Sequence, residues 1–176
     1  MAGLARARVR FVVMGVQGVN HYARSAGMLF TTQDYDLFLP PSAANELRAW
    51  KACRALGAGL WCGDEPLGAP LDLFLARRIV DARALVRAEY EGLQVDLSLT
   101  MADFKFQSVW RRRRTFRVEG VTVPVARLSD IVASKAATGR PKDRLFLATH
   151  EEALRGLLTP SRRRKASART APRRGR

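Results

Sequence analysis

Short apolar stretches and amphipathic stretches follow one another along most of the chain, and glycine or proline residues separate many of them. Stretches rich in Val, Leu, Phe and Tyr, some with apolar–polar alternation, are typical of β-strands. Apolar positions that recur at helical spacing are typical of amphipathic helices. The pattern predicts strands at residues 9–14, 34–39, 84–90, 93–99, 115–118 and 121–125, and helices at 2–7, 16–27, 42–56, 129–138, 141–149 and 151–158.

Two glycine-containing dipeptides indicate how some of the strands are joined. Glu91-Gly92 and Glu119-Gly120 each stand between two predicted strands. A two-residue connection with glycine is typical of a tight β-hairpin turn. We therefore expect two antiparallel hairpins, whereas residues 60–72 contain several turn-forming residues and predict no regular element.

The composition is that of an ordinary globular protein, with 47% hydrophobic and 27% charged residues. A chain of 176 residues is long enough for one domain with a core. The order of strands and helices predicts a single α+β (mixed α/β) domain at residues 1–158, with a central mixed sheet flanked by helices. Its apolar runs are far shorter than the roughly 20 residues that cross a bilayer, and the N-terminus lacks the apolar segment of a secretory signal. We expect no membrane association and a cytoplasmic location.

Positive charge is concentrated at the C-terminal end. The net charge is +15, and residues 159–176 hold eight Lys or Arg and no acidic residue. This segment also lacks large apolar residues, so it cannot bury enough surface to offset the entropy lost on ordering. We predict a disordered basic tail at 159–176. It is either an arm attracted to nucleic acid or another polyanion, or a solvated tail without a partner.

Acidic residues interrupt two of the predicted strands. Asp34 and Asp36 lie two apart on one strand, so their side chains point to the same face. Neighbouring carboxylates repel one another unless a cation or a proton intervenes, and Mg²⁺ prefers carboxylate oxygens, water and phosphates. Asp96 interrupts the apolar stretch LQVDLSL. Each of these acids also has a structural interpretation, as a solvent-facing position on a strand.

Two further segments are suited to phosphate. Gly15, Val16 and Gly18 lie between the first strand and the helix that follows it, where backbone N–H groups at the positive end of a helix can bind anions. Lys135, Arg140 and Lys142 surround the junction between two later helices. The glycines could equally serve packing, and the three basic residues could form a solvated surface.

In combination, these segments resemble the DNA-polymerase-beta-like nucleotidyltransferase superfamily, in its small prokaryotic branch of minimal and abortive-infection-type members. VVMGVQGVNHYA resembles the turn and helix, TTQDYDLFL the strand with Asp-x-Asp, and LQVDLSL the strand with the third acid. VPVARLSDIVASKAATGRPKDRLFL resembles the segment that follows in small members. The resemblance covers about residues 9–150. Val16 stands where the family has a second glycine or a serine, and Phe30 where it commonly has an arginine.

The resemblance implies a nucleotidyltransferase that moves a nucleoside monophosphate from a nucleoside triphosphate to an acceptor. Asp34, Asp36 and Asp96 would be the catalytic residues and would hold magnesium, with two ions in the family's arrangement. Phosphates would lie along the segment from Gly15 through Val16 to Gly18, near Lys135, Arg140 and Lys142. The acceptor would be a hydroxyl or amine of RNA, of a protein or of a small molecule, and a toxin-type role would imply an antitoxin partner. The alternative is a catalytically impaired member that binds nucleotide or RNA, as Val16 suggests.

Overall fold

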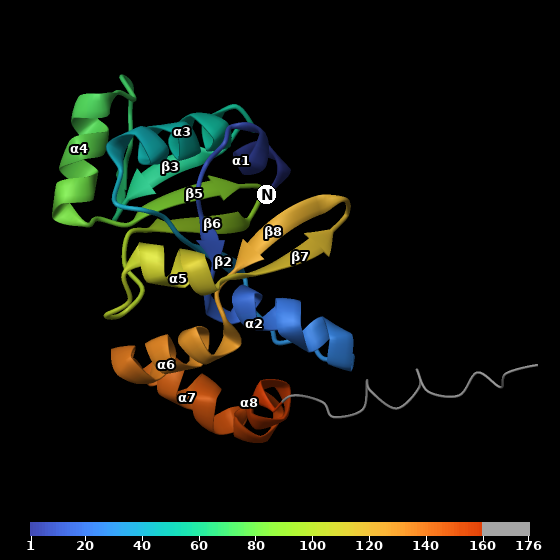
Figure 1. Ribbon diagram of the computed structural model, residues 1–176. Helices are drawn as coiled ribbons and strands as arrows, with labels where there is room; N and C mark the ends of the chain where they lie inside the picture. Colours follow the sequence, from blue (N-terminus) through green and yellow to red (C-terminus); the bar gives the residue numbers. More distant parts are fainter. Residues whose placement is uncertain (160–176) are drawn as a thin grey trace, which may run out of the picture.

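The computed structural model describes residues 1–159, which form one mixed β-sheet with helices on both of its faces (Figure 1). This arrangement confirms the predicted α+β class. The described helices are α1 (Ala2–Arg6), α2 (Gly15–Ala23), α3 (Ala43–Arg54), α4 (Leu73–Ala82), α5 (Phe106–Arg112), α6 (Leu128–Thr138), α7 (Pro141–Thr149) and α8 (Glu151–Leu158), with a short 3₁₀ helix η1 (Arg24–Ala26). The strands are β1 (Val12–Val13), β2 (Asp34–Phe38), β3 (Gly59–Cys62), β4 (Glu65–Pro66), β5 (Val86–Tyr90), β6 (Leu93–Ser98), β7 (Arg114–Val118) and β8 (Val121–Val125). Residues 160–176, which are all but the first residue of the predicted basic tail, lie outside the described residues.

The eight strands lie in the order β4-β3-β5-β6-β2-β1-β8-β7. At the centre, β2 pairs parallel with β6 and antiparallel with β1, and β1 pairs parallel with β8. Both predicted hairpins are confirmed, because β5 pairs antiparallel with β6 and β7 with β8. Glu91 and Glu119 have φ of 48° and 49°, and each is followed by a glycine with φ of 79°. Positive φ at both central residues is the geometry of the tight hairpin turn that these dipeptides favour.

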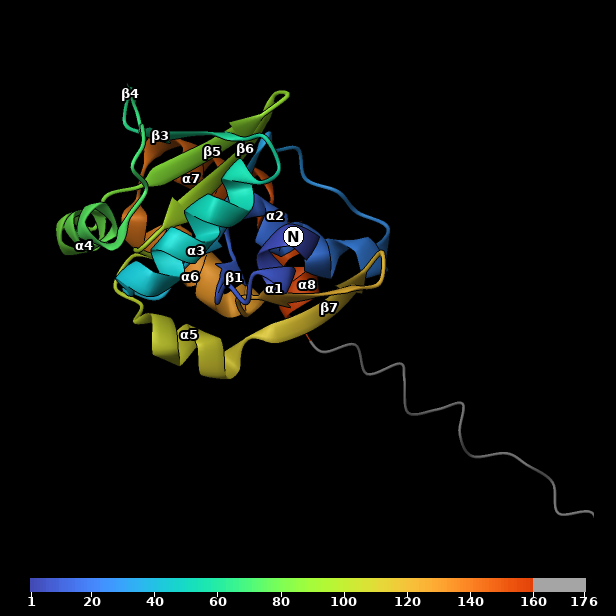
Figure 2. The same cartoon turned by 90° about the horizontal axis from the view of Figure 1, so that it is seen from above.

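Apolar side chains of the central strands are completely buried between the two layers of helices. Val12, Val13, Leu37 and Leu97 have no exposed surface. Helix α3, with α1 beside it, covers one face of the sheet, and α2, α6, α7 and α8 lie on the other side (Figures 1 and 2). Removing apolar surface from water stabilises the fold by about 25 cal/mol per Å². None of the helices in residues 1–159 is long and apolar enough to cross a membrane.

Strand β1 is much shorter than the predicted strand at 9–14, because a side chain takes the place of a neighbouring strand. Asn45 of α3 accepts a hydrogen bond from the backbone N–H of Arg10 at 2.8 Å and donates to its carbonyl at 3.0 Å. These two bonds satisfy the backbone of Arg10, and regular pairing begins only at Val12.

Three further features differ from the predicted elements. The β3–β4 hairpin occupies part of the turn-rich segment 60–72, and α4 follows it where no helix was expected. Asp72 begins α4 by accepting a hydrogen bond from the N–H of Leu75 at 2.9 Å, as an N-cap residue does. Helix α6 begins at Leu128, one residue before the predicted start at 129.

Candidate metal centre

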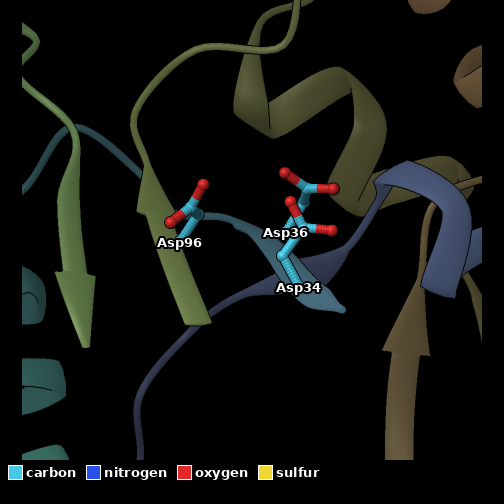
Figure 3. Close-up of side chains that lie close together, drawn as sticks. All are labelled: Asp34, Asp36 and Asp96. Atoms are coloured by element: carbon cyan, nitrogen blue, oxygen red, sulfur yellow. The ribbon is translucent and has the colours of Figure 1, made fainter. Parts of the chain in front are cut away.

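Three aspartates meet on the two parallel strands at the centre of the sheet. Asp34 and Asp36 point to the same side of β2, and Asp96 on β6 is the direct register partner of Asp36. One carboxylate oxygen of each residue lies within 4.8 Å of the corresponding oxygens of the other two (Figure 3). The structure therefore brings together all three residues that the sequence predicts as metal ligands.

The three carboxylates are close together and only partly solvated. Asp96 is buried, with 7% of its surface exposed, and Asp34 and Asp36 are half-buried. Burial, and then the negative charges of Asp34 and Asp96, raise the pKa of the Asp36 carboxyl, while Lys135 and Lys142 lower it to a smaller extent. Such a cluster favours the binding of a cation or a proton, because either one relieves the repulsion.

Arg87 on β5 is a charged neighbour of this cluster that the sequence analysis did not identify. Its Nε lies 2.7 Å from Oδ1 of Asp96 and its Nη2 lies 3.1 Å from Oδ2, so the guanidinium uses both carboxylate oxygens. The hydrogen bond to Asp96 raises the pKa of Arg87 above its usual value. The pair could have been predicted from the sequence. A two-residue turn at Glu91-Gly92 fixes the register of the hairpin, and in that register Arg87 lies opposite Asp96.

Gly15 begins α2 directly beside Asp36. Its φ is +62°, and a Cβ atom at this position would lie only 1.8 Å from Oδ2 of Asp36. The backbone N–H of Met14 donates to the carbonyl of Asp36 at 2.9 Å, which holds the two segments together. Only glycine therefore fits here without displacing the Asp36 carboxylate. The first turn of α2 also lies beside the cluster, with the positive end of its dipole.

The other two residues of the predicted phosphate-binding segment lie elsewhere. Residues 15–18 form the first turn of α2 and not an open loop. Gly18 is buried, a Cβ on it would lie 2.7 Å from Cδ1 of Ile131, and its N–H donates to the carbonyl of Met14. Val16 is half-buried and packs against the core. Gly15 lines the cleft beside the acids, whereas Val16 and Gly18 do not.

Two of the predicted basic residues stand across the cleft from the acids. A cleft of about 250 Å³ is lined by Gly15, Asp36 and Asp96 on one side and by Lys135 and Arg140 on the other. The exposed Lys142 is not among the lining residues, although its charge lowers the pKa of Asp36.

A buried carboxylate holds the two lining cations. Asp143 accepts from Nζ of Lys135 at 2.7 Å and from Nε of Arg140 at 2.8 Å. Burial raises the pKa of Asp143, but the hydrogen bonds from these two residues outweigh that effect and keep the pKa below its usual value. The Asp143 side chain is 1% exposed, so both cations are held by a carboxylate that is withdrawn from solvent.

Comparison of the chain with protein families and with curated proteins finds no match. What this site can do is therefore argued from its own chemistry. It combines three clustered carboxylates, a glycine that leaves them room, a helix N-terminus and two cations on the opposite wall of one cleft. Hard divalent cations and phosphate groups are the ligands that this combination suits.

Proposed function

We propose that this chain is a metal-dependent nucleotidyltransferase that transfers a nucleoside monophosphate from a nucleoside triphosphate to an acceptor. The observation that carries the proposal is the convergence of Asp34, Asp36 and Asp96 from two parallel strands, with Asp36 and Asp96 in register and both lining one cleft. The resemblance of the acidic segments to the polymerase-beta-like superfamily points to the same chemistry.

The residues present fit a magnesium ion. All three candidate ligands are carboxylates, whose oxygens are the donors that Mg²⁺ takes from proteins. Gly15 leaves room for the Asp36 carboxylate itself, because Oδ2 of Asp36 lies where a Cβ atom at position 15 would be. Magnesium bound by Asp34, Asp36 and Asp96 would supply charge neutralisation and Lewis acidity at the phosphates.

The chain's own groups would bind and orient the triphosphate. Lys135 and Arg140 face the acids across the cleft and can offset phosphate charge, as prearranged cations do where negative charge develops. Asp143 holds both cations and limits the reorganisation they need when a triphosphate enters.

The acceptor would attack the α-phosphorus, and pyrophosphate would leave. The acceptor must also lose a proton. Asp96 can take that proton on a lone pair that the two hydrogen bonds from Arg87 leave free, because each carboxylate oxygen has two lone pairs.

A second candidate function is binding of a nucleotide or RNA without turnover. Its support is the same Arg87–Asp96 pair, since a guanidinium already neutralises the third carboxylate. Val16, which the resemblance associates with impaired catalysis, packs against the core and does not line the cleft, so it lends this candidate no direct support.

The acceptor, the partners and the location belong to the proposal too. An RNA or protein acceptor, a toxin-type role with an antitoxin partner, and a cytoplasmic location are what the resemblance and the sequence imply. A compartment that supplies nucleoside triphosphates and Mg²⁺ is the one requirement that the chemistry itself sets.

The test is to incubate the full-length protein with each of the four α-labelled nucleoside triphosphates, Mg²⁺ and cell extract, and to follow label that enters a larger molecule. We expect transfer with at least one triphosphate, and a loss of 100-fold or more in Asp34→Asn and in Asp36→Asn. Asp64→Asn, which removes the same charge from an exposed turn, should transfer normally. Equal transfer by Asp36→Asn and the parent protein would reject the site, and magnesium-dependent triphosphate binding without transfer would favour the second candidate.

A further inference from the structure

A group of arginines around the C-terminal end of α5 carries positive charge outside the acidic cleft. It involves α5 and the residue that follows it, the start of β7, the segment before β1, one turn of α3 and the residue before α6. Figure 2 shows α5 leading directly into β7 along one edge. We call it the arginine surface, and its members are Arg10, Arg48, Arg111, Arg113, Arg114 and Arg127.

Contacts with Trp110 and Asn45 join the parts of this surface. The guanidinium carbon of Arg113 lies 3.8 Å, and that of Arg10 4.8 Å, from the ring centroid of Trp110. Arg48 donates to Oδ1 of Asn45 at 3.2 Å, and the same oxygen accepts from the backbone of Arg10. Arg127 donates to the carbonyl of Arg112 at 3.0 Å. These contacts join Arg10, Arg48 and Arg113 around Trp110 and Asn45, and Arg127 joins them through the backbone of the run 111–114, to which Arg111 and Arg114 belong.

Its positive charge is largely uncompensated within the described residues. Of the run 111–114, only Arg112 forms a salt bridge there, with Asp130 at 3.1 Å. Arg10 and Arg113 share one aromatic ring, so their charges are less than a Debye length of about 10 Å apart at 0.1 M salt. The buried Nε of Arg113 has no hydrogen-bond acceptor in residues 1–159. Like charges held this closely are stabilised when a polyanion binds.

The chemistry of the surface favours nucleic acid over other anionic partners. Guanidinium groups bind phosphates through two parallel hydrogen bonds, and their planes can stack on unpaired bases. None of the large exposed apolar side chains in the described part of the chain belongs to this surface, which argues against membrane insertion and against an apolar protein interface. We propose that the arginine surface binds a single-stranded polynucleotide, with phosphates on the exposed guanidiniums.

The surface also lies close in sequence to the cleft. Thr100, Met101 and Ala102 line the cleft, and α5 begins at Phe106. The arginines follow at the C-terminal end of α5, and none of the six lines the cleft. Binding itself does not depend on nucleotidyl transfer.

The test measures the affinity of the full-length protein for a short labelled single-stranded RNA by fluorescence anisotropy over a range of salt concentrations. The double variant Arg10→Gln with Arg113→Gln should bind roughly tenfold more weakly near 0.1 M salt, and its log–log salt slope should fall by about 1.4, or about 0.7 per lost phosphate contact. Arg77→Gln with Arg78→Gln removes the same charge from the exposed side of α4 and should change affinity less than twofold. Single-stranded DNA of the same sequence should show the same pattern.

Several outcomes would overturn the assignment. If both double variants bind RNA equally more weakly than the parent, only net charge matters. If neither binds RNA more weakly, the arginine surface does not take part in binding. The affinity of Arg10→Gln with Arg113→Gln for phosphatidylserine vesicles and for duplex nucleic acid should also be measured. If this variant loses more affinity for the vesicles or for the duplex than for single strands, the chosen partner is contradicted.

If Arg10→Gln with Arg113→Gln fails to fold, Arg111→Gln with Arg114→Gln replaces it, because these two side chains form no hydrogen bond or salt bridge in residues 1–159. Asp36→Asn should keep full RNA affinity, so loss of transfer and loss of RNA binding are separable.

Discussion

Asp36 in the cleft and Glu46 in the core are both acids whose pKa burial raises, and their surroundings are very different. Asp36 shares its space with two other carboxylates, a glycine and a cleft with cations on its far wall. Glu46 of α3 is completely buried, accepts one hydrogen bond from Nε1 of Trp50 at 3.0 Å, and has no partner for Oε2 among the described residues. Its pKa rises to about 7, chiefly through burial.

The comparison separates a buried acid from a binding centre. A raised pKa shows in both cases that the charged form is poorly solvated. Only at Asp36 do several ligands converge on a space that a cation and a phosphate can enter. Glu46 can relieve its charge only by taking up a proton, so it should influence stability and not catalysis.

The largest effect is expected at Gly15. Gly15→Ala places a methyl group where Oδ2 of Asp36 lies, so the carboxylate must move, and transfer should fall by 100-fold or more. The positive φ adds a strain of about 1–2 kcal/mol. Gly63→Ala is the matched control, because its φ is +61° and a Cβ there meets nothing within 4 Å. If both variants lose stability equally and both keep transfer activity, the close fit of Gly15 against Asp36 is irrelevant to function.

Glu46→Gln should change how the free energy of unfolding depends on pH but leave transfer intact. Below the unfolded pKa of 4.5 the carboxyl is protonated in both states and adds no pH dependence to the free energy of unfolding. Between pH 4.5 and about 7 the unfolded chain loses its proton first, so the free energy of unfolding falls as pH rises. The total loss is about 3 kcal/mol, and it stays constant above pH 7.

The measurement is urea unfolding of the parent and of Glu46→Gln from pH 4 to 8. The glutamine can still accept from Trp50, so the variant should be more stable than the parent above pH 7, with a difference that disappears near pH 4. Glu65→Gln, at an exposed strand position, should follow the parent at every pH. A difference between Glu46→Gln and the parent that does not vary with pH would contradict the assignment.

A smaller effect is expected from Arg87, which competes with a cation for Asp96. In Arg87→Gln both oxygens of Asp96 become free, so Mg²⁺ should bind several-fold more tightly and raise the unfolding midpoint more than it does in the parent. Thermal unfolding at a series of Mg²⁺ concentrations measures this. Weaker magnesium binding in Arg87→Gln would instead mean that the guanidinium positions Asp96 for the metal.

The smallest effect is expected at Val16. Its side chain packs against the core and does not line the cleft, so Val16→Ser should change kcat/KM for the triphosphate by less than fivefold, a free-energy change of about 1 kcal/mol. A large gain in activity would show that the bulk of the Val16 side chain limits phosphate binding.

Local sequence determined much of what could be predicted. The hairpin dipeptides and the Asp-x-Asp strand are short-range features, and the structure contains both hairpins and brings the three acids together. The short β1 depends on Asn45, which is 35 positions from Arg10 in the sequence, and no local pattern reveals that contact. The packing of Gly18 on Ile131 is long-range for the same reason. Arg87 was accessible in principle, because the predicted turn fixes its register.

The central claim is that Asp34, Asp36 and Asp96 form a divalent-metal centre, and Mn²⁺ binding tests it most directly. Mn²⁺ takes the same oxygen ligands as Mg²⁺ and can be followed by electron paramagnetic resonance. We predict saturable Mn²⁺ binding to the parent protein and to Asp64→Asn, competed by Mg²⁺, and its loss in Asp36→Asn. Absence of saturable binding in the parent, or equal binding in all three proteins, would contradict the account.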